Sequence, residues 1–237
     1  MAWYAVPENP KAAAVLLHCV RCNRVDMLAR AELLWRNHFA ILVPDLQAHG
    51  ESTGEAITFG YLESRDAVAS LGFMRRHHPT LPLGAIGSSL GGAALVLAGS
   101  SLDSDAVVLE AVYPTIDEAV ANRIAIRLGP LSKVLTPLLL LQLEPRLGVS
   151  RSELRPIDSI GQLSCPVLIV AGELDRHTTK EETIHLFEAA TGPKELWLVE
   201  GASHQDLYSY DPEGYTANVL GFLEHYLLGE SNAEVTS

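Results

Sequence analysis

The chain has 237 residues, 48% of them hydrophobic, and carries a formal net charge of −12. This length suits one α/β domain, and folding buries roughly 70–75% of the surface that an unfolded chain of this size exposes. The negative charge argues against binding to nucleic acid or to an anionic membrane.

Buried strands are predicted to alternate with helices along most of the chain. The expected strands are Trp3–Val6, Ala13–Cys19, Phe39–Asp45, an apolar run from Leu81, Ala106–Tyr113, Cys165–Gly172 and Glu195–Glu200. The expected helices are Val25–Arg36, Tyr61–His77, Ala93–Ala98 and Lys180–Ala190. Such alternation predicts an α/β fold with a mostly parallel central sheet and helices on both faces.

A Gly-Ser-Ser-Leu-Gly motif follows the apolar run from Leu81 and precedes a helix of small residues. The Gly-x-Ser-x-Gly spacing selects Ser89, because Ile86 and Leu90 would flank Ser88 where glycines are needed. In such an elbow the serine backbone is strained, and its hydroxyl is exposed beside the free N–H groups that begin the helix. The alternative is an ordinary glycine-rich turn, since the pentapeptide alone is a weak signal.

Two further polar residues follow predicted strands. Asp175 comes shortly after the strand Cys165–Gly172, and His204 comes shortly after Glu195–Glu200. A serine nucleophile needs a base, and the base needs a carboxylate that orients it. Because the carboxyl ends of parallel strands meet at one edge of a sheet, we expect Ser89, Asp175 and His204 to lie close together.

Together these motifs resemble the α/β-hydrolase fold serine hydrolases, of the esterase and serine-aminopeptidase-like branch. The resemblance covers nearly the whole chain and includes the loops at His18 and at Pro44–Ser52. It implies the α/β-hydrolase fold with a short helical cap insertion. It also implies that Ser89 is the nucleophile, His204 the general base and Asp175 the acid of a catalytic triad, with no metal or organic cofactor.

The activity that the resemblance implies is cleavage of the carboxylic ester bond of a small acyl substrate through an acyl-enzyme. A thioesterase or an aminopeptidase-like amidase is the alternative within this class. From a different class, the chain could be a non-catalytic binding protein on a hydrolase scaffold. Such proteins normally lose a triad residue, whereas this chain has all three.

The resemblance places two backbone amides in the oxyanion hole, those of Val20 and of Leu90. Relatives usually have His-Gly where this chain has His18 and Cys19. If that position requires a positive φ, the cysteine strains the loop. Two other carboxylates, Glu110 and Glu173, stand near strand ends, and for Glu110 we favour a buried structural role over that of the triad acid.

Segment 115–158 interrupts the alternation at the position where many relatives insert a cap. Its apolar run Leu131–Leu143 is too short, and too interrupted by a lysine and a proline, to form a membrane-spanning helix of about 20 residues. We expect a lid in which Leu135 and Leu139 line a pocket for an apolar acyl group. Packing on the domain, or a contact in a homodimer, is the alternative.

The cysteines and the amino terminus give information about the cellular compartment of the protein. Three cysteines, an odd number, predict no disulfide framework and fit a reducing cytoplasm. The pair Cys19-x-x-Cys22 also invites a zinc or redox interpretation, which we disfavour because no second ligand pair has zinc spacing. The amino terminus has no basic segment or long apolar run, so we expect no signal peptide.

Overall fold

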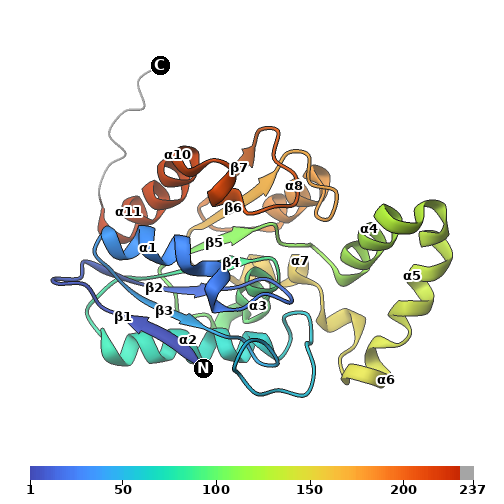
Figure 1. Ribbon diagram of the computed structural model, residues 1–237, viewed down its shortest axis with the longest axis horizontal. Coiled ribbons are helices and arrows are strands. Elements are labelled where there is room, and N and C mark those ends of the chain that lie inside the picture. The colour runs from blue at the N-terminus through green and yellow to red at the C-terminus, as the bar shows by residue number, and fades with distance from the viewer. Residues whose placement is uncertain (230–237) are drawn as a thin grey trace.

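The computed structural model describes residues 1–229, which form a seven-stranded sheet between helices (Figure 1). The strands are β1 (Ala2–Ala5), β2 (Ala12–Leu17), β3 (Phe39–Pro44), β4 (Leu83–Ser88), β5 (Ala106–Glu110), β6 (Val167–Gly172) and β7 (Lys194–Val199). The helices are α1 (Leu28–Arg36), α2 (Glu63–His77), α3 (Leu90–Leu97), α4 (Ile116–Leu128), α5 (Ser132–Leu140), α6 (Leu143–Leu147), α7 (Pro156–Ser159), α8 (Lys180–Ala189), α9 (Leu207–Tyr210), α10 (Pro212–Tyr215) and α11 (Gly221–Leu228). The predicted α/β architecture is confirmed.

The strand order creates a crevice at one edge of the sheet. The order is β1-β3-β2-β4-β5-β6-β7, and every neighbouring pair is parallel except β1 and β3. From β2 the chain moves to β3 on one side, and from β4 it moves toward β7 on the other. The order therefore reverses between β2 and β4, and ligands of open α/β sheets bind beyond the strand ends at such a point.

Alternate residues of the central strands supply the cores on the two faces of the sheet. Val15 and Leu17 of β2 belong to the core that includes α2 and α3, whereas Ala14 and Leu16 belong to the core that includes α1 and α11. The four side chains are fully buried. Figure 1 shows α1 and α11 along one face and α2 and α3 along the other.

Each predicted strand differs from the structure at one end or both, by one to three residues. The first strand begins at Ala2 rather than Trp3, and it pairs antiparallel with β3 through contacts such as Trp3 with Val43. The strand predicted to run to Tyr113 ends at Glu110. It stops there because Ala111 has a φ of 48°, which is incompatible with a strand.

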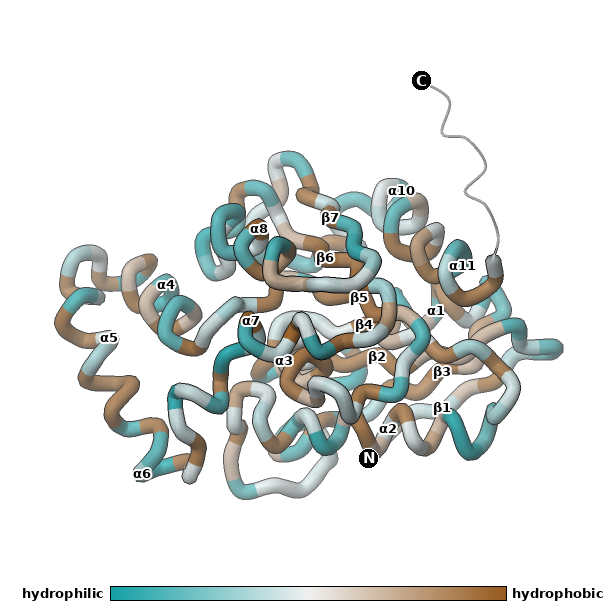
Figure 2. Tube along the Cα trace, turned by 180° about the vertical axis from the view of Figure 1, so that it is seen from behind, coloured by the Kyte–Doolittle hydropathy of each residue, from teal (hydrophilic) through white to brown (hydrophobic). Residues whose placement is uncertain are grey.

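The insertion expected at 115–158 folds as the helices α4 to α7 between β5 and β6. In Figure 1, α4, α5 and α6 stand at the far right, beside the sheet rather than against either face. Figure 2 shows hydrophobic residues along the strands, and also several on α5. Within residues 1–229, no helix has both the length and the apolar composition needed to cross a membrane.

Candidate active site

The turn between β4 and α3 has the geometry of a nucleophile elbow. Ser89 has φ 48° and ψ −102°, a conformation that L-residues rarely adopt. A Cβ at Gly87 would lie 2.5 Å from the Gly92 nitrogen, and one at Gly91 would lie 2.4 Å from the Leu17 carbonyl oxygen. Glycine is therefore required at both positions. The Ser89 amide donates to the Glu110 carbonyl oxygen at 2.7 Å, which ties the strained turn to β5.

An acid–base pair lies at the ends of the next strands. Asp175 follows β6, His204 follows β7, and His204 Nδ1 lies 2.7 Å from Asp175 Oδ2. The other carboxylate oxygen of Asp175 accepts hydrogen bonds from the His177 amide at 2.7 Å and the Thr178 amide at 3.1 Å. Burial acts to raise the pKa of Asp175, but the hydrogen bonds, first that of His204, outweigh it and lower the pKa. Asp175 is therefore ionised at neutral pH.

Ser89 and His204 share a pocket of about 370 Å³, here called the His204 pocket, whose lining also includes Met27 and Arg30. The serine hydroxyl makes no hydrogen bond to His204 within the described residues. With Nδ1 bound to the carboxylate, the Nε2 atom of His204 is the ring nitrogen left for a proton from the serine or a ligand. Catalytic hydrogen bonds are often long without substrate.

The loop after β2 presents a backbone amide near Ser89. Val20 and Leu90 line the same pocket as Ser89, and neither amide donates to an acceptor in residues 1–229. The Leu46 amide donates to His18 Nε2 at 3.0 Å, so the ring proton is on Nδ1, which donates to the Cys19 carbonyl oxygen at 2.8 Å. In a trans peptide the C=O and N–H point in opposite directions. His18 thus fixes the direction of the Val20 N–H.

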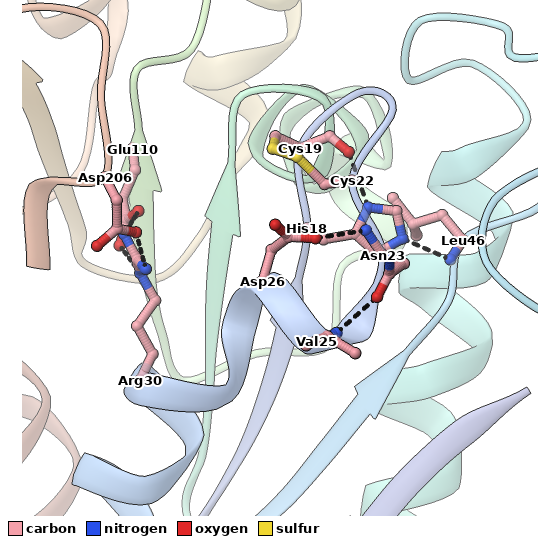
Figure 3. Close-up of a disulfide and its surroundings, with 10 residues drawn as sticks. All are labelled: His18, Cys19, Cys22, Asn23, Val25, Asp26, Arg30, Leu46, Glu110 and Asp206. Atoms are coloured by element: carbon pink, nitrogen blue, oxygen red, sulfur yellow. Dashed lines mark hydrogen bonds and ion pairs between the residues drawn. A yellow bond between two sulfur atoms is a disulfide. The ribbon is translucent and has the colours of Figure 1, made fainter. Parts of the chain in front are cut away.

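Cys19 and Cys22 form a disulfide, so the prediction of a chain without one is wrong (Figure 3). The two residues are the ends of a tight turn in which the Cys22 amide donates to the Cys19 carbonyl oxygen at 3.3 Å. This proximity brings the sulfur atoms together, and an odd total of cysteines says nothing about a local pair. Cys165 is buried and unpaired.

The positive φ considered for Cys19 falls instead on Arg21, at 62°. In the turn from Cys19 to Cys22, Arg21 holds the third position, which requires a positive φ in a type II turn and normally carries glycine or asparagine. The backbone strain of the loop is therefore at Arg21.

The competing carboxylates have structural partners. Glu110 is buried and accepts hydrogen bonds from Arg30 Nε at 2.9 Å and Arg30 Nη2 at 2.7 Å, as well as from the Tyr215 hydroxyl. Arg30 also reaches Asp206 at 2.5 Å, as Figure 3 shows beside the disulfide. Glu173 pairs with Lys180 at 2.9 Å. Neither Glu110 nor Glu173 makes a hydrogen bond to His204 within the described residues.

The second pocket that Ser89 lines also measures about 370 Å³ and is here called the Arg123 pocket. The largest share of its walls comes from α4, and the rest comes from the elbow, the loops after β2 and before α2, and single residues elsewhere. Leu139 lines it, whereas Leu135, the other predicted substrate contact, does not. The two leucines are four residues apart and share a face of α5, so the pocket reaches the turn of the helix that carries Leu139 and not the turn before it.

Four residues near the site were missed by sequence reasoning. The ring of His177 lies 4.5 Å from that of His204, centroid to centroid. Burial, and then the positive charges of nearby groups, lower the pKa of His177. Three arginines, Arg21, Arg123 and Arg127, line the Arg123 pocket. The spacing of Arg123 and Arg127, four residues apart on one helix face, was the available signal.

Comparison with known proteins agrees with this architecture. No established family profile matches the chain. A protein of Bacillus subtilis (strain 168), described as uncharacterized protein YqkD, is 27% identical over 228 residues, which is 94% of this chain and 74% of that protein. The structure of the Pyrococcus furiosus esterase Pf2001 is similar, with a TM-score of 0.78, 21% identity, and coverage of 95% of this chain and 86% of that one.

A Paleococcus ferrophilus monoacylglycerol lipase is also similar, with a TM-score of 0.66, 20% identity, and coverage of 95% of this chain and 99% of that one. A further similar structure is described as the α/β hydrolase GrgF from Penicillium sp. sh18, with a TM-score of 0.74 and 17% identity. These likenesses show that the chain has the α/β-hydrolase fold.

Proposed function

We propose that this protein is a serine hydrolase that cleaves carboxylic esters, with Ser89 as nucleophile, His204 as general base and Asp175 as the acid that orients it. The observation that carries the proposal is the 2.7 Å hydrogen bond from His204 to Asp175, beside a pocket that His204 shares with a serine of φ 48°. A strained serine that faces an oriented histidine is the arrangement that acyl transfer requires. Esterases and a lipase among the similar structures support an ester as the substrate.

In the first step, Ser89 Oγ attacks the ester carbonyl carbon while His204 Nε2 takes the hydroxyl proton. The carbonyl oxygen becomes an oxyanion, and the Val20 and Leu90 amides donate to it. The C–O bond to the alcohol then breaks, and His204 gives its proton to the leaving oxygen. Water attacks the resulting acyl-enzyme, His204 again takes and returns a proton, and the free acid leaves with Ser89 restored.

Two side chains prepare these steps without touching the substrate. Asp175 stays ionised and so stabilises the imidazolium that forms when His204 holds the proton. His18 holds the Cys19 carbonyl, and through that peptide it aims the Val20 amide. The oxyanion donors are thus in place before the charge develops, which is what makes such donors effective.

The test is labelling with a fluorophosphonate probe. Attack of Ser89 Oγ on phosphorus expels fluoride and leaves a covalent adduct, which intact-mass spectrometry detects. We expect wild type and Ser88→Ala to be labelled and Ser89→Ala to be unlabelled. Ser89→Ala should also lower the rate of ester hydrolysis on the order of 10⁶-fold. A labelled and active Ser89→Ala variant would refute the proposal.

A further inference from the structure

The Arg123 pocket carries more positive charge than the composition of the chain suggests. Its lining includes Arg21, Arg123 and Arg127 and no aspartate or glutamate. The whole chain, by contrast, has 29 acidic residues against 17 lysines and arginines. The remaining walls are mostly apolar, so three arginines line a largely apolar cavity at Ser89, with Arg123 half-buried and Arg21 and Arg127 exposed at its edge.

These three guanidinium groups have no protein partner among the described residues. Within residues 1–229, none of them makes a hydrogen bond or an ion pair, whereas Arg24, Arg30, Arg75, Arg151 and Arg155 each bind a carboxylate. Arg123 is half-buried, and burial together with the charges of Arg21 and Arg127 lowers its pKa, against the effects of Tyr113 and Asp175. The positive charge that three neighbouring arginines concentrate at a half-buried position favours the binding of an anion.

The backbone of Arg21 is strained. Its φ of 62° suits glycine or asparagine, and other residues rarely adopt the left-handed region because it is sterically unfavourable for them. The Cys19–Cys22 disulfide closes the turn around it. Strain of this kind at the edge of an active site points to a role for the side chain.

The position of His204 assigns the two pockets to the two halves of an ester. His204 must protonate the leaving alcohol, and it lines the His204 pocket but not the Arg123 pocket. The acyl half therefore extends into the Arg123 pocket. A volume of about 370 Å³ falls within the range of small-molecule sites and leaves room for a short chain between the apolar walls.

We propose that the acyl substrate carries a carboxylate at its far end, and that Arg21, Arg123 and Arg127 bind it. The inference rests on the proposed ester hydrolysis and names the substrate class for that site. The substrates would be monoesters of short dicarboxylic acids. Methylene groups contact the apolar walls, and the planar guanidinium groups match the carboxylate with paired hydrogen bonds.

The test compares two esters with acyl chains of equal length, mono-p-nitrophenyl adipate and p-nitrophenyl hexanoate. We expect wild type to show a kcat/KM at least tenfold higher for the adipate. Because a hydrogen bond to a charged group contributes about 10- to 100-fold, Arg123→Gln should lower the adipate-to-hexanoate ratio by that factor. Arg127→Gln tests the same point at an exposed position if Arg123→Gln does not fold.

Arg146→Gln is the matched control, because it removes the same charge from an exposed arginine of α6 that does not line the pocket. Its ratio should equal that of wild type. A wild-type ratio near one, or equal effects of Arg127→Gln and Arg146→Gln, overturns the substrate class and leaves ester hydrolysis standing. Absence of both hydrolysis and Ser89 labelling would instead refute the proposed function.

Discussion

The strand ends and the cap are built in contrasting ways. At the strand ends, polar side chains are buried and bound: Asp175 accepts three hydrogen bonds and Glu110 also accepts three. On the cap, apolar side chains are exposed to solvent, with exposed fractions of 60% for Leu131, 54% for Leu138 and 69% for Leu141. The polar groups at the strand ends are therefore fixed by directional hydrogen bonds, whereas many apolar side chains of the cap remain in contact with solvent.

We infer from this difference that the strand ends determine the catalytic chemistry and that the cap determines substrate selectivity. A hydrogen-bonded network permits one arrangement of its members, which suits groups that must meet within hydrogen-bond distance. A helical arm that exposes many of its side chains accepts substitutions at those positions more readily. We therefore expect substitutions at the strand ends to alter catalysis or stability, and substitutions on the cap to alter the choice of substrate.

The largest effect in this comparison is expected at Asp175. Asp175→Asn keeps the shape but removes the charge that stabilises protonated His204, so kcat for p-nitrophenyl hexanoate should fall about 10⁴-fold. Glu173→Gln is the control, because its carboxylate pairs with Lys180 at the surface. That variant should keep most of the activity. Steady-state kinetics of both variants measure this, and a larger loss in Glu173→Gln would reverse the assignment.

The next effect concerns stability and the buried ion pair below the site. Glu110→Ala leaves Arg30 buried without its main partner, and we expect it to lower the free energy of unfolding by about 3–5 kcal/mol. The exposed pair of Glu32 and Arg36 provides a control, since Glu32→Ala should cost under about 1 kcal/mol. Urea unfolding measures both values. Equal costs would mean that the buried network contributes no more than a surface pair.

On the cap, Leu139 and Leu138 form a matched pair. Both are exposed leucines of α5, but Leu139 lines the Arg123 pocket and Leu138 does not. Leu139→Asn should lower kcat/KM by about fourfold for each acyl methylene that the leucine contacts, and so affect hexanoate esters more than acetate esters. Leu138→Asn should leave the chain-length profile unchanged. Equal losses for all chain lengths would favour a folding defect or a dimer contact over the lid.

The smallest effect is a pH dependence of stability that arises from His18. Burial lowers the pKa of His18, despite its hydrogen bond to the Cys19 carbonyl. At pH values between the lowered pKa of folded His18 and its unfolded pKa near 6.5, this side chain binds a proton only in the unfolded chain. The free energy of unfolding therefore falls as the pH falls below about 6.5. Urea unfolding should give a lower free energy of unfolding at pH 5.5 than at pH 7.5, and the loss should be smaller in His18→Gln. An unchanged loss in that variant would exclude His18 as its source.

Sequence reasoning succeeded where a residue type and its place on a strand were sufficient. The Gly-x-Ser-x-Gly spacing predicted a strained Ser89, and the order of strand ends predicted that Asp175 and His204 would meet. It failed where the outcome depended on local backbone geometry or on how far a pocket extends along a helix. Counting cysteines could not reveal the pair across a four-residue turn, and composition could not distinguish Leu139 from Leu135.

Crowding at the elbow limits how this site can diverge. A single added carbon at position 87 or 91 would collide with backbone atoms, and one at Gly92 would lie 2.3 Å from Val112 Cγ2. Substitution of these three glycines is thus closed to natural selection and to the protein engineer alike. Libraries aimed at new substrates should keep Ser89 and the three glycines and randomise Arg123, Arg127 and Leu139, which line the pocket proposed for the acyl group.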